Sequence, residues 1–356
     1  MQRTVRIRSP ASRNKFESVR LFLLEYSRCV NHFIEMYWSE QGFDDSYVDS
    51  AHMENAKERF SLTARLIQCA GRQALQIVRS QRMKSVRQRR MPRYNALSAT
   101  LDSRFWTISD ERNSFEWVKV QSGFKHFLPF RRTAMWNRWH GAGFTLSKSI
   151  RLFIRGSNLY IDFIFEKDAP APGTEGEVIG MDSGYVDMAV CSDGQVAGKG
   201  MNAFIRSFDV REKHTHEQVR QKAFSELKKL DLSGVRTLVI EGLHSVKSRT
   251  RGMFPRAHNR RLSHWLYARE AEWLEQRCEE QGIELRRVSP WKTSQFCRFC
   301  GKWDRRSRSG KVFRCVHCGH TDDADMNGAQ NIRLLGLAGV YSLRLLPDKF
   351  IGNICL

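Results

Sequence analysis

The chain has 356 residues and is long enough for two or three globular domains, and 41% of its residues are hydrophobic. It has no run of about 18 apolar residues, and its basic N-terminus lacks the apolar stretch of a secretory signal, so we expect neither a membrane span nor secretion. Lys and Arg number 59 against 38 Asp and Glu, and this net charge of +21 favours a polyanion as partner over a basic surface without one. We therefore expect a cytoplasmic, nucleoid-associated protein.

The first 94 residues are predicted to contain a strand and two long helices. Residues 4–8 alternate in strand fashion, while apolar residues recur at three- and four-residue steps over 14–38 and 61–90. On the second helix three arginines lie seven residues apart and form one row, which continues into a cluster without acidic residues. Solvated helix faces normally mix charges, so we favour nucleic-acid contact over a merely solvated face. The residues expected to make this contact are Arg65, Arg72, Arg79, Arg82, Lys84, Arg87, Arg89 and Arg90.

From residue 95 to 167 the apolar period changes to two. Several short runs rich in β-branched and aromatic residues predict antiparallel strands, arranged as a small barrel. Trp136 and Trp139 stand among basic residues, where either stacking on bases or core packing would explain them. The Pro- and Gly-rich segment 167–177 predicts a linker and a domain boundary.

The second half is predicted to be α/β. Beyond the linker we expect a strand–turn–strand and a further short strand over residues 177–200. Helices are predicted over 210–230 and 260–281, with strands at 236–241 and 283–289. This order of elements matches that of the ribonuclease H-like fold.

Two carboxylates end apolar strands of this half. Asp182 closes VIGMD and Glu241 closes TLVIE, and an acid at the end of a buried strand is costly unless it is paired or binds a metal. A capping or turn role would explain either acid alone. As a pair on a basic chain they favour a nuclease or transposase core that holds Mg²⁺ or Mn²⁺, because these ions prefer oxygen ligands.

The third acid of such a site is expected from the sequence TDDAD. Helical spacing over residues 326–339 places Asp325 nearest to the first turn of a helix, where the helix dipole favours a negative charge. Asp322 and Asp323 are expected to cap the helix or to face solvent.

Four cysteines predict a zinc site. Cys297, Cys300, Cys315 and Cys318 follow the spacing C-x2-C-x14-C-x2-C, and Gly301 and Gly319 provide the turns of two knuckles. Two disulfides or an iron–sulfur cluster are the alternatives. His317 and His320 are expected to be bystanders, and between the pairs a basic tip is suited to a phosphate backbone, through Arg305, Arg306 and Arg308. The remaining cysteines are expected to be reduced: Cys29, Cys69, Cys191, Cys278 and Cys355.

Several motifs resemble a known family. GMDSGYVDMAV, VIEGL, TSQFCRFCG and CVHCGHTDDADMNGAQNI follow one another in the order and spacing of TnpB, a family of transposon-encoded, RNA-guided DNA nucleases related to the type V CRISPR effectors. The resemblance covers residues 178–335. Three positions depart from the usual pattern, Ser183, Trp291 and Gly328, and none of them is a predicted metal-binding acid.

The resemblance implies a domain plan. A wedge-like β-barrel would comprise residues 1–10 and 95–170, with a helical recognition domain at 11–94 inserted into it. A RuvC nuclease domain, which is ribonuclease H-like, would comprise 176–290 and 321–356. A zinc-ribbon insert that binds the target nucleic acid would occupy residues 291–320.

The resemblance also implies an activity. It predicts cleavage of double-stranded target DNA, directed by a guide RNA, with Asp182, Glu241 and Asp325 binding catalytic Mg²⁺ and the cysteines binding structural Zn²⁺. The wedge and the helical domain would hold the guide RNA and read a short motif beside the target. The alternatives are a guided DNA-binding repressor without nuclease activity, a miniature type V CRISPR effector, and a transposase that performs strand transfer.

Overall fold

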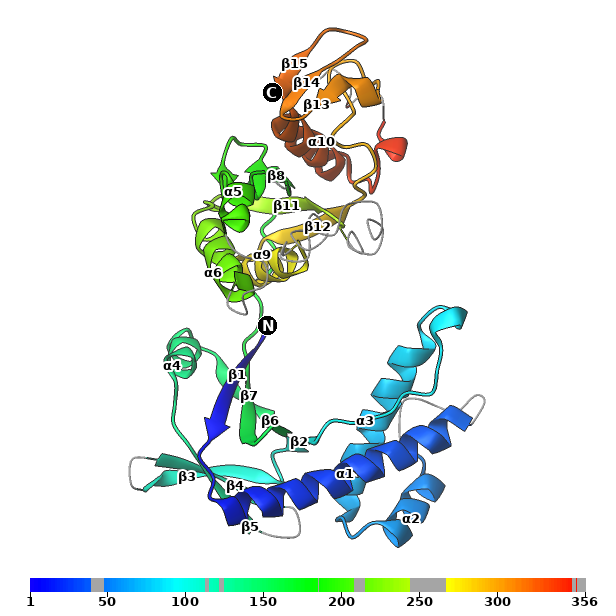
Figure 1. Cartoon of the computed structure of the whole chain (residues 1–356), viewed down its shortest axis with the longest axis vertical. Helices are drawn as coiled ribbons and strands as arrows, with labels where there is room; N and C mark the ends of the chain where they lie inside the picture. Colours follow the sequence, from blue (N-terminus) through cyan, green and yellow to red (C-terminus); the bar gives the residue numbers. More distant parts are fainter. Residues whose placement is uncertain are drawn as a thin grey trace. The chain divides into compact units, whose positions relative to one another are not determined.

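A computed structural model of the chain describes residues 1–39, 48–112, 115–121, 125–184, 186–207, 215–243, 267–347 and 350. The chain divides into two compact units, Met1–Asp168 and Ala169–Leu356 (Figure 1). The division falls at the start of the Pro- and Gly-rich segment that was predicted to be a linker. Each unit has hydrophobic clusters of its own.

The strands of the first unit form two antiparallel sheets. The larger has the order β1 (Gln2–Ser9), β7 (Asn158–Glu166), β6 (Thr145–Arg155) and β2 (Ser98–Asp102). The smaller has the order β3 (Trp106–Arg112), β4 (Phe115–Gln121) and β5 (Lys125–Phe130). Alternate residues of β1 are buried, as the period-two pattern predicted. Closure of the two sheets into one barrel stays a prediction.

A helix interrupts the part of the chain predicted to be all strand. α4 (Ala134–Gly141) begins at Thr133, whose hydroxyl accepts a hydrogen bond from the Trp136 N–H. Trp136 is 4% exposed and packs edge-on against Phe163 and Phe165, so it belongs to the core and is not available for stacking on bases. Trp139 is partly buried against the same core.

Three helices complete the first unit, α1 (Arg13–Ser39), α2 (Ser50–Arg59) and α3 (Ala64–Arg82), and α1 packs against α3 (Figure 1). The prediction of a single helix over 61–90 is wrong at its end. α3 stops at Arg82, and only a short 3₁₀ turn, Val86–Gln88, follows. Crowded like charges and Pro92 disfavour further helix there. In the parts of the chain that the structure describes, no helix is long and apolar enough to cross a bilayer.

The second unit contains a mixed five-stranded sheet with the order β10 (Val196–Ala197), β9 (Ala189–Cys191), β8 (Glu177–Asp182), β11 (Val235–Glu241) and β12 (Glu284–Val288). β8, β11 and β12 are parallel to one another, whereas β9 pairs antiparallel with β8 and β10 pairs antiparallel with β9. A short helix that was not predicted, α5 (Met201–Arg206), follows β10.

Helices cover both faces of this sheet. The predicted helices over 210–230 and 260–281 are observed as α6 (Thr215–Leu227) and α9 (Tyr267–Gln281), and residues 208–214 and 244–266 lie outside the described residues. Ile179 and Leu238 pack with these two helices, whereas their neighbours Val178 and Val239 pack with α10 (Ala324–Ala338). Side chains alternate along a strand, so α10 lies on the opposite face from α6 and α9.

A small ribbon is inserted between β12 and α10. It consists of a 3₁₀ turn, Arg305–Ser307, and the strands β13 (Arg308–Ser309), β14 (Val312–Arg314) and β15 (Thr321–Asp323). Phe313 is fully buried and packs against Cys297 and Cys315. A 3₁₀ turn, Leu343–Leu345, follows α10. Within the segment 321–356 predicted for the nuclease domain, residues 348–349 and 351–356, Cys355 among them, lie outside the described residues.

Candidate functional site

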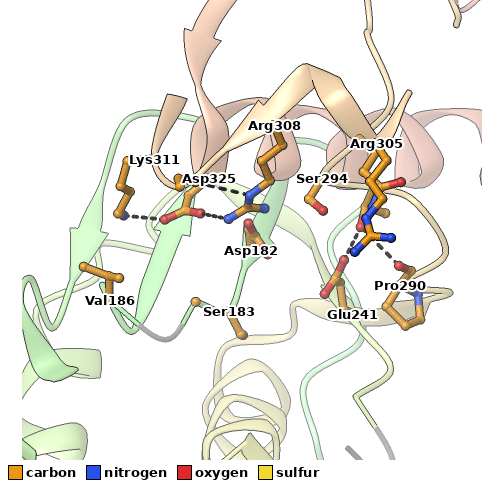
Figure 2. Close-up of a pocket in the computed structure, with 14 residues that line it drawn as sticks. Asp182, Ser183, Val186, Glu241, Pro290, Ser294, Arg305, Arg308, Lys311 and Asp325 are labelled. Carbon is orange, nitrogen blue, oxygen red and sulfur yellow. Dashed lines mark hydrogen bonds and ion pairs between the residues drawn. The ribbon is translucent and has the colours of Figure 1, made fainter. Parts of the chain in front are cut away.

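Three predicted acids meet at one edge of the mixed sheet. Asp182 and Glu241 are the last residues of the neighbouring parallel strands β8 and β11, and the carboxyl ends of parallel strands lie at the same edge. α10 starts beside them and brings Asp325 in its first turn. All three carboxylates line one open pocket of about 670 Å³ (Figure 2).

Glycines allow α10 and the acids to approach closely. A Cβ atom on Gly180 of β8 would lie only 2.9 Å from the backbone Cα of Arg333 in α10. A Cβ on Gly328 would lie 2.7 Å from Asp182 Oδ2, so this carboxylate rests directly on the helix backbone. The residue types at these two positions therefore determine how near Asp182 comes to the helix that carries Asp325.

The three aspartates after the second cysteine pair have separate positions. Asp323 is the N-cap of α10, and its Oδ1 accepts hydrogen bonds from the N–H groups of Asp325 and Met326. Asp322 pairs with Arg298 at 3.1 Å. Asp325 is 3% exposed and is the one of the three that lines the pocket. The assignment of Asp325 as a metal ligand stays a prediction.

Burial and mutual repulsion make the ionised acids costly. Burial raises the pKa of Asp182 well above its ordinary value, and the carboxylates of Glu241 and Asp325 raise it further. Burial also raises the pKa of Glu241, against the effect of a hydrogen bond from Thr293. A cation in the pocket would relieve this repulsion.

Two basic side chains of the ribbon supply positive charge to the pocket. Arg308 Nη2 lies 2.8 Å from Asp325 Oδ1, and Lys311 Nζ pairs with the other oxygen, Oδ2 (Figure 2). Lys311 also lies 2.6 Å from Asp187 Oδ2. Arg308 was predicted to contact nucleic acid, which stays a prediction, and in the structure it pairs with a predicted catalytic acid. The two cations offset the charge of the acid cluster.

The other residues of the basic tip differ in position. Arg305 is exposed and lines the pocket, pointing toward it from the ribbon (Figure 2). Arg306 is paired with Asp304 of its own turn at 2.8 Å. Of the three arginines predicted at this tip, Arg305 and Arg308 line the pocket, and Arg305 is the more exposed of the two.

Several groups around the pocket were not predicted from the sequence. Thr293 donates a hydrogen bond to Glu241, and Ser183 donates one to Glu270 at 3.0 Å. Asp187 holds Lys311 and accepts the Gly200 N–H at 2.8 Å. Thr293 and Asp187 fall inside the family motifs quoted from the sequence. Their position in these motifs is the signal that could have identified them. Neither residue ends a buried strand, the criterion that singled out the acids.

The four predicted cysteines converge in the ribbon. Their sulfur atoms all lie within 4.8 Å of one another, with 3.6 Å between Cys297 and Cys318 and between Cys300 and Cys315. Gly301 and Gly319 have positive φ and donate their N–H groups to the carbonyls of Cys297 and Cys315, which forms the two knuckle turns. Four thiols at this separation fit one tetrahedral Zn²⁺ ion.

The basic residues predicted to contact nucleic acid in the first unit differ in their contacts and exposure. Arg65 pairs with Asp102 at 2.9 Å, and Arg82 donates hydrogen bonds to the carbonyls of Tyr37 and Trp38. Lys84 and Arg89 form local hydrogen bonds. Arg72, Arg79, Arg87 and Arg90 are exposed, as are Lys84 and Arg89. Their contact with nucleic acid stays a prediction.

The segment around the ribbon is similar to a described domain. Residues 267–332 match the family model of the Cas12f1-like TNB domain. The CRISPR-associated endodeoxyribonuclease Cas12f1 of Sulfoacidibacillus thermotolerans is 36% identical over 77 residues, 21% of this chain and 18% of that protein. Cas12f1 of an uncultured archaeon is 33% identical over 106 residues, 28% of this chain and 19% of that protein. The matched segments thus span less than a fifth of these relatives.

The similarity of the fold extends further. The cryo-EM structure of a Cas12f1–sgRNA–target DNA complex matches 90% of this chain and 83% of that chain, with a TM-score of 0.53 and 15% identity. The α/β fold thus resembles that of Cas12f1 across most of the chain. Part of the sequence and most of the fold are thus similar to the nuclease Cas12f1, and membership of TnpB stays a prediction.

The two candidate metal centres differ in chemistry and in location. Three carboxylates form an all-oxygen set, which fits Mg²⁺ or Mn²⁺, and the four thiols fit Zn²⁺. Asp325 follows Cys318 by only seven residues, yet β15 and the cap of α10 separate them. Their closeness in the sequence therefore marks the return of the chain from the ribbon to the mixed sheet.

Proposed function

We propose that this chain is an RNA-guided DNA endonuclease that uses Mg²⁺ or Mn²⁺ at the acid pocket. The observation that carries this proposal is the convergence of Asp182, Glu241 and Asp325, from β8, β11 and α10, in one open pocket beside a ribbon with four clustered cysteines. The net charge of +21 and the similarity to the nuclease Cas12f1 support nucleic acid as the substrate class.

The side chains of the pocket have complementary roles in this proposal. The three acids would hold the divalent cations, which when bound lower the pKa of a water molecule and stabilise charge on the leaving oxygen. Arg305, at the rim, would pair with phosphate oxygens of the DNA and orient the scissile bond. In-line attack on the phosphorus, with the 3′ oxygen as leaving group, predicts products with 5′-phosphate ends.

The binding partners of this chain are part of the proposal, because the similarities to known proteins do not identify them. We propose that a guide RNA is held by the first unit, and that the ribbon handles the target strand. A transposon origin of the TnpB kind and an origin as a miniature type V effector differ in their guide. Sequencing the RNA that copurifies with the protein distinguishes them, because one predicts a transposon end and the other a CRISPR repeat.

The test is cleavage of a plasmid that carries the target, with the copurified RNA and Mg²⁺. Asp182→Ala, Glu241→Ala and Asp325→Ala should each abolish cleavage and leave the affinity for RNA unchanged, because none of these acids lies in the first unit. Asp323→Asn is the matched control, since it removes one carboxylate from the same stretch but keeps an oxygen for the cap.

Two outcomes would contradict this proposal. Cleavage at the normal rate by the Asp325→Ala protein would show that the pocket is not the catalytic site. Guided binding to the target without cleavage by the unsubstituted protein would favour the DNA-binding repressor instead.

A further inference from the structure

The turn before the first zinc knuckle, residues 290–297, lies between the acid pocket and the cysteine cluster. Thr293, Ser294 and Gln295 of this turn line the pocket, and Cys297 belongs to the cysteine cluster. Thr293 is only 3% exposed although its side chain is polar. A buried hydroxyl in a folded protein is expected to have a hydrogen-bond partner.

That partner is Glu241. Thr293 Oγ1 donates to Glu241 Oε1, and the next acceptor, the carbonyl oxygen of Pro290, lies 3.4 Å away. A hydroxyl has a single proton, and a bond to a carboxylate is stronger than one to a carbonyl, so the proton goes to Glu241. This bond selects one orientation of the carboxylate.

The helix that carries Asp325 holds the same turn. Asn331 Nδ2 donates to the carbonyl of Thr293 at 2.7 Å and to that of Phe296 at 2.8 Å, and Asn327 Nδ2 donates to Phe296 at 3.0 Å. Both asparagines are fully buried and lie four residues apart, so they share one face of α10. The turn is therefore positioned relative to the acid pocket from the side of α10.

The zinc knuckle holds the turn from the other side. The N–H groups of Gln295 and Phe296 both donate to the carbonyl of Lys292, at 2.9 and 3.0 Å. Cys297 N–H donates to the carbonyl of Lys302 at 2.9 Å, and Phe296 pairs with Trp303 across the knuckle. A metal ion bound by all four thiolates would fix this knuckle, and with it the position of Thr293.

We propose that Thr293 is a positioning residue for Glu241, and that through it zinc binding in the ribbon sets the affinity of the acid pocket for its divalent cation. This inference rests on the proposed function, because it requires Glu241 to be a metal ligand. The ribbon then does more than contact nucleic acid, since it completes the pocket from 52 residues further along the chain.

The experiment measures Mn²⁺ binding to the full chain, freed of nucleic acid, from the EPR signal of unbound Mn²⁺. Thr293→Val keeps the shape of the side chain but loses the donor, and removing such a supporting hydrogen bond should weaken Mn²⁺ binding by about 10- to 100-fold. Thr293→Ser keeps the hydroxyl and should bind within about threefold of the unsubstituted protein, by the same reasoning. The zinc content of both variants should be unchanged.

A double variant separates positioning from general support of the fold. In a Glu241→Gln background, Thr293→Val should cause no further loss of Mn²⁺ affinity, whereas a residue that only stabilises the fold would cause the same loss in both backgrounds. If Glu241→Gln alone binds Mn²⁺ normally, the proposed metal site is wrong. If Glu241→Gln is weakened while Thr293→Val binds normally, only the role of Thr293 is wrong.

The zinc part of the inference has its own variant. Cys318 is the exposed ligand of the second knuckle and does not line the pocket. Cys318→Ser should lose zinc and weaken Mn²⁺ binding about as much as Thr293→Val does, roughly 10- to 100-fold, and the two effects should not add. Unchanged Mn²⁺ affinity in zinc-free Cys318→Ser protein would overturn the coupling between the two sites.

Discussion

The residues at which this chain departs from the usual TnpB pattern each have a partner in the structure. Gly328 leaves space for the carboxylate of Asp182, which a Cβ atom would approach to 2.7 Å. Ser183 donates to the buried carboxyl of Glu270. Trp291 packs edge-on against Trp303, with Arg344 over its ring at 4.4 Å. Two of these three residues, Ser183 and Gly328, therefore adjust the surroundings of Asp182.

Glu270 gives a prediction for the pH dependence of stability. It is 4% exposed, and burial raises its pKa to about 8, from an ordinary value of 4.5. Between these pH values the folded protein binds more protons than the unfolded one, so the stability falls as the pH rises. Glu270→Gln should raise the free energy of unfolding above pH 8 by a few kcal/mol, at about 1.4 kcal/mol per unit of pKa.

Thermal unfolding at pH 5 and pH 8.5 checks this prediction. The gain from Glu270→Gln should be small at pH 5, because the carboxyl of the unsubstituted protein is then protonated in the folded state. Glu272, on the same helix, is half exposed and pairs with Arg269, so Glu272→Gln should show no such difference between the two pH values. A gain from Glu270→Gln that is equal at both would contradict the assigned cause.

At the scale of elements, the contact of α10 with β8 depends on Gly180. The neighbours that a Cβ atom would meet there are backbone atoms of Ala329 and Arg333, which cannot move aside as a side chain can. Gly180→Ala should therefore push the helix from the strand and destabilise the protein by about 1–3 kcal/mol. It should also weaken Mn²⁺ binding, because Asp182 and Asp325 belong to the two separated elements.

Thermal unfolding and Mn²⁺ titration check this prediction. Gly141→Ala is the matched control, since a Cβ atom on Gly141 meets no atom within 4 Å and the residue ends α4 without a positive φ. The control should leave both the unfolding temperature and the Mn²⁺ affinity unchanged. Equal behaviour of the two variants would mean that the close approach of strand and helix is not required.

The basic residues of α3 and the segment after it separate into two kinds. Arg72 and Arg87 are exposed, whereas Arg82 ties α3 to the end of α1 through two carbonyl oxygens. The double variant Arg72→Ala/Arg87→Ala should leave stability unchanged and reduce the salt slope of RNA binding by about 0.7 per lost phosphate contact. Arg82→Ala should instead lower the stability by about 1–3 kcal/mol, because two partly buried carbonyl acceptors at the end of α1 lose their donor.

Filter binding at several salt concentrations, together with thermal unfolding, checks this prediction. The two variants serve as controls for each other, because each should change one measurement and not the other. Loss of stability without loss of RNA affinity in the double variant would assign Arg72 and Arg87 to the fold instead.

At the scale of the whole molecule, the net charge of +21 predicts strongly salt-dependent binding of RNA. Each phosphate that the protein neutralises in single-stranded RNA contributes about −0.7 to the slope of log K against log salt, so six contacts would give about −4. The slope is measured with the full chain between 50 and 300 mM salt, roughly the range over which this dependence is steep. A slope near zero would exclude a phosphate backbone as the main partner.

The properties that the sequence determined by itself are those encoded by local spacing. The cysteine knuckles need only two cysteines three positions apart and a following glycine, and α1 needs only an apolar residue at every third or fourth position. Asp182 and Glu241 were found because each ends an apolar strand, and Asp325 because it begins a helix.

The tertiary structure alone decided which side chains meet. Arg308 pairs with Asp325 across 17 positions, Arg65 pairs with Asp102 across 37, and Thr293 bonds to Glu241 across 52. The sequence marked these arginines as basic and therefore as candidates for phosphate. Local propensity cannot show that folding places an acid beside them, because that depends on how distant elements pack. Trp136 follows the same rule, since an exposed and a buried tryptophan look alike until the strands that cover it are in place.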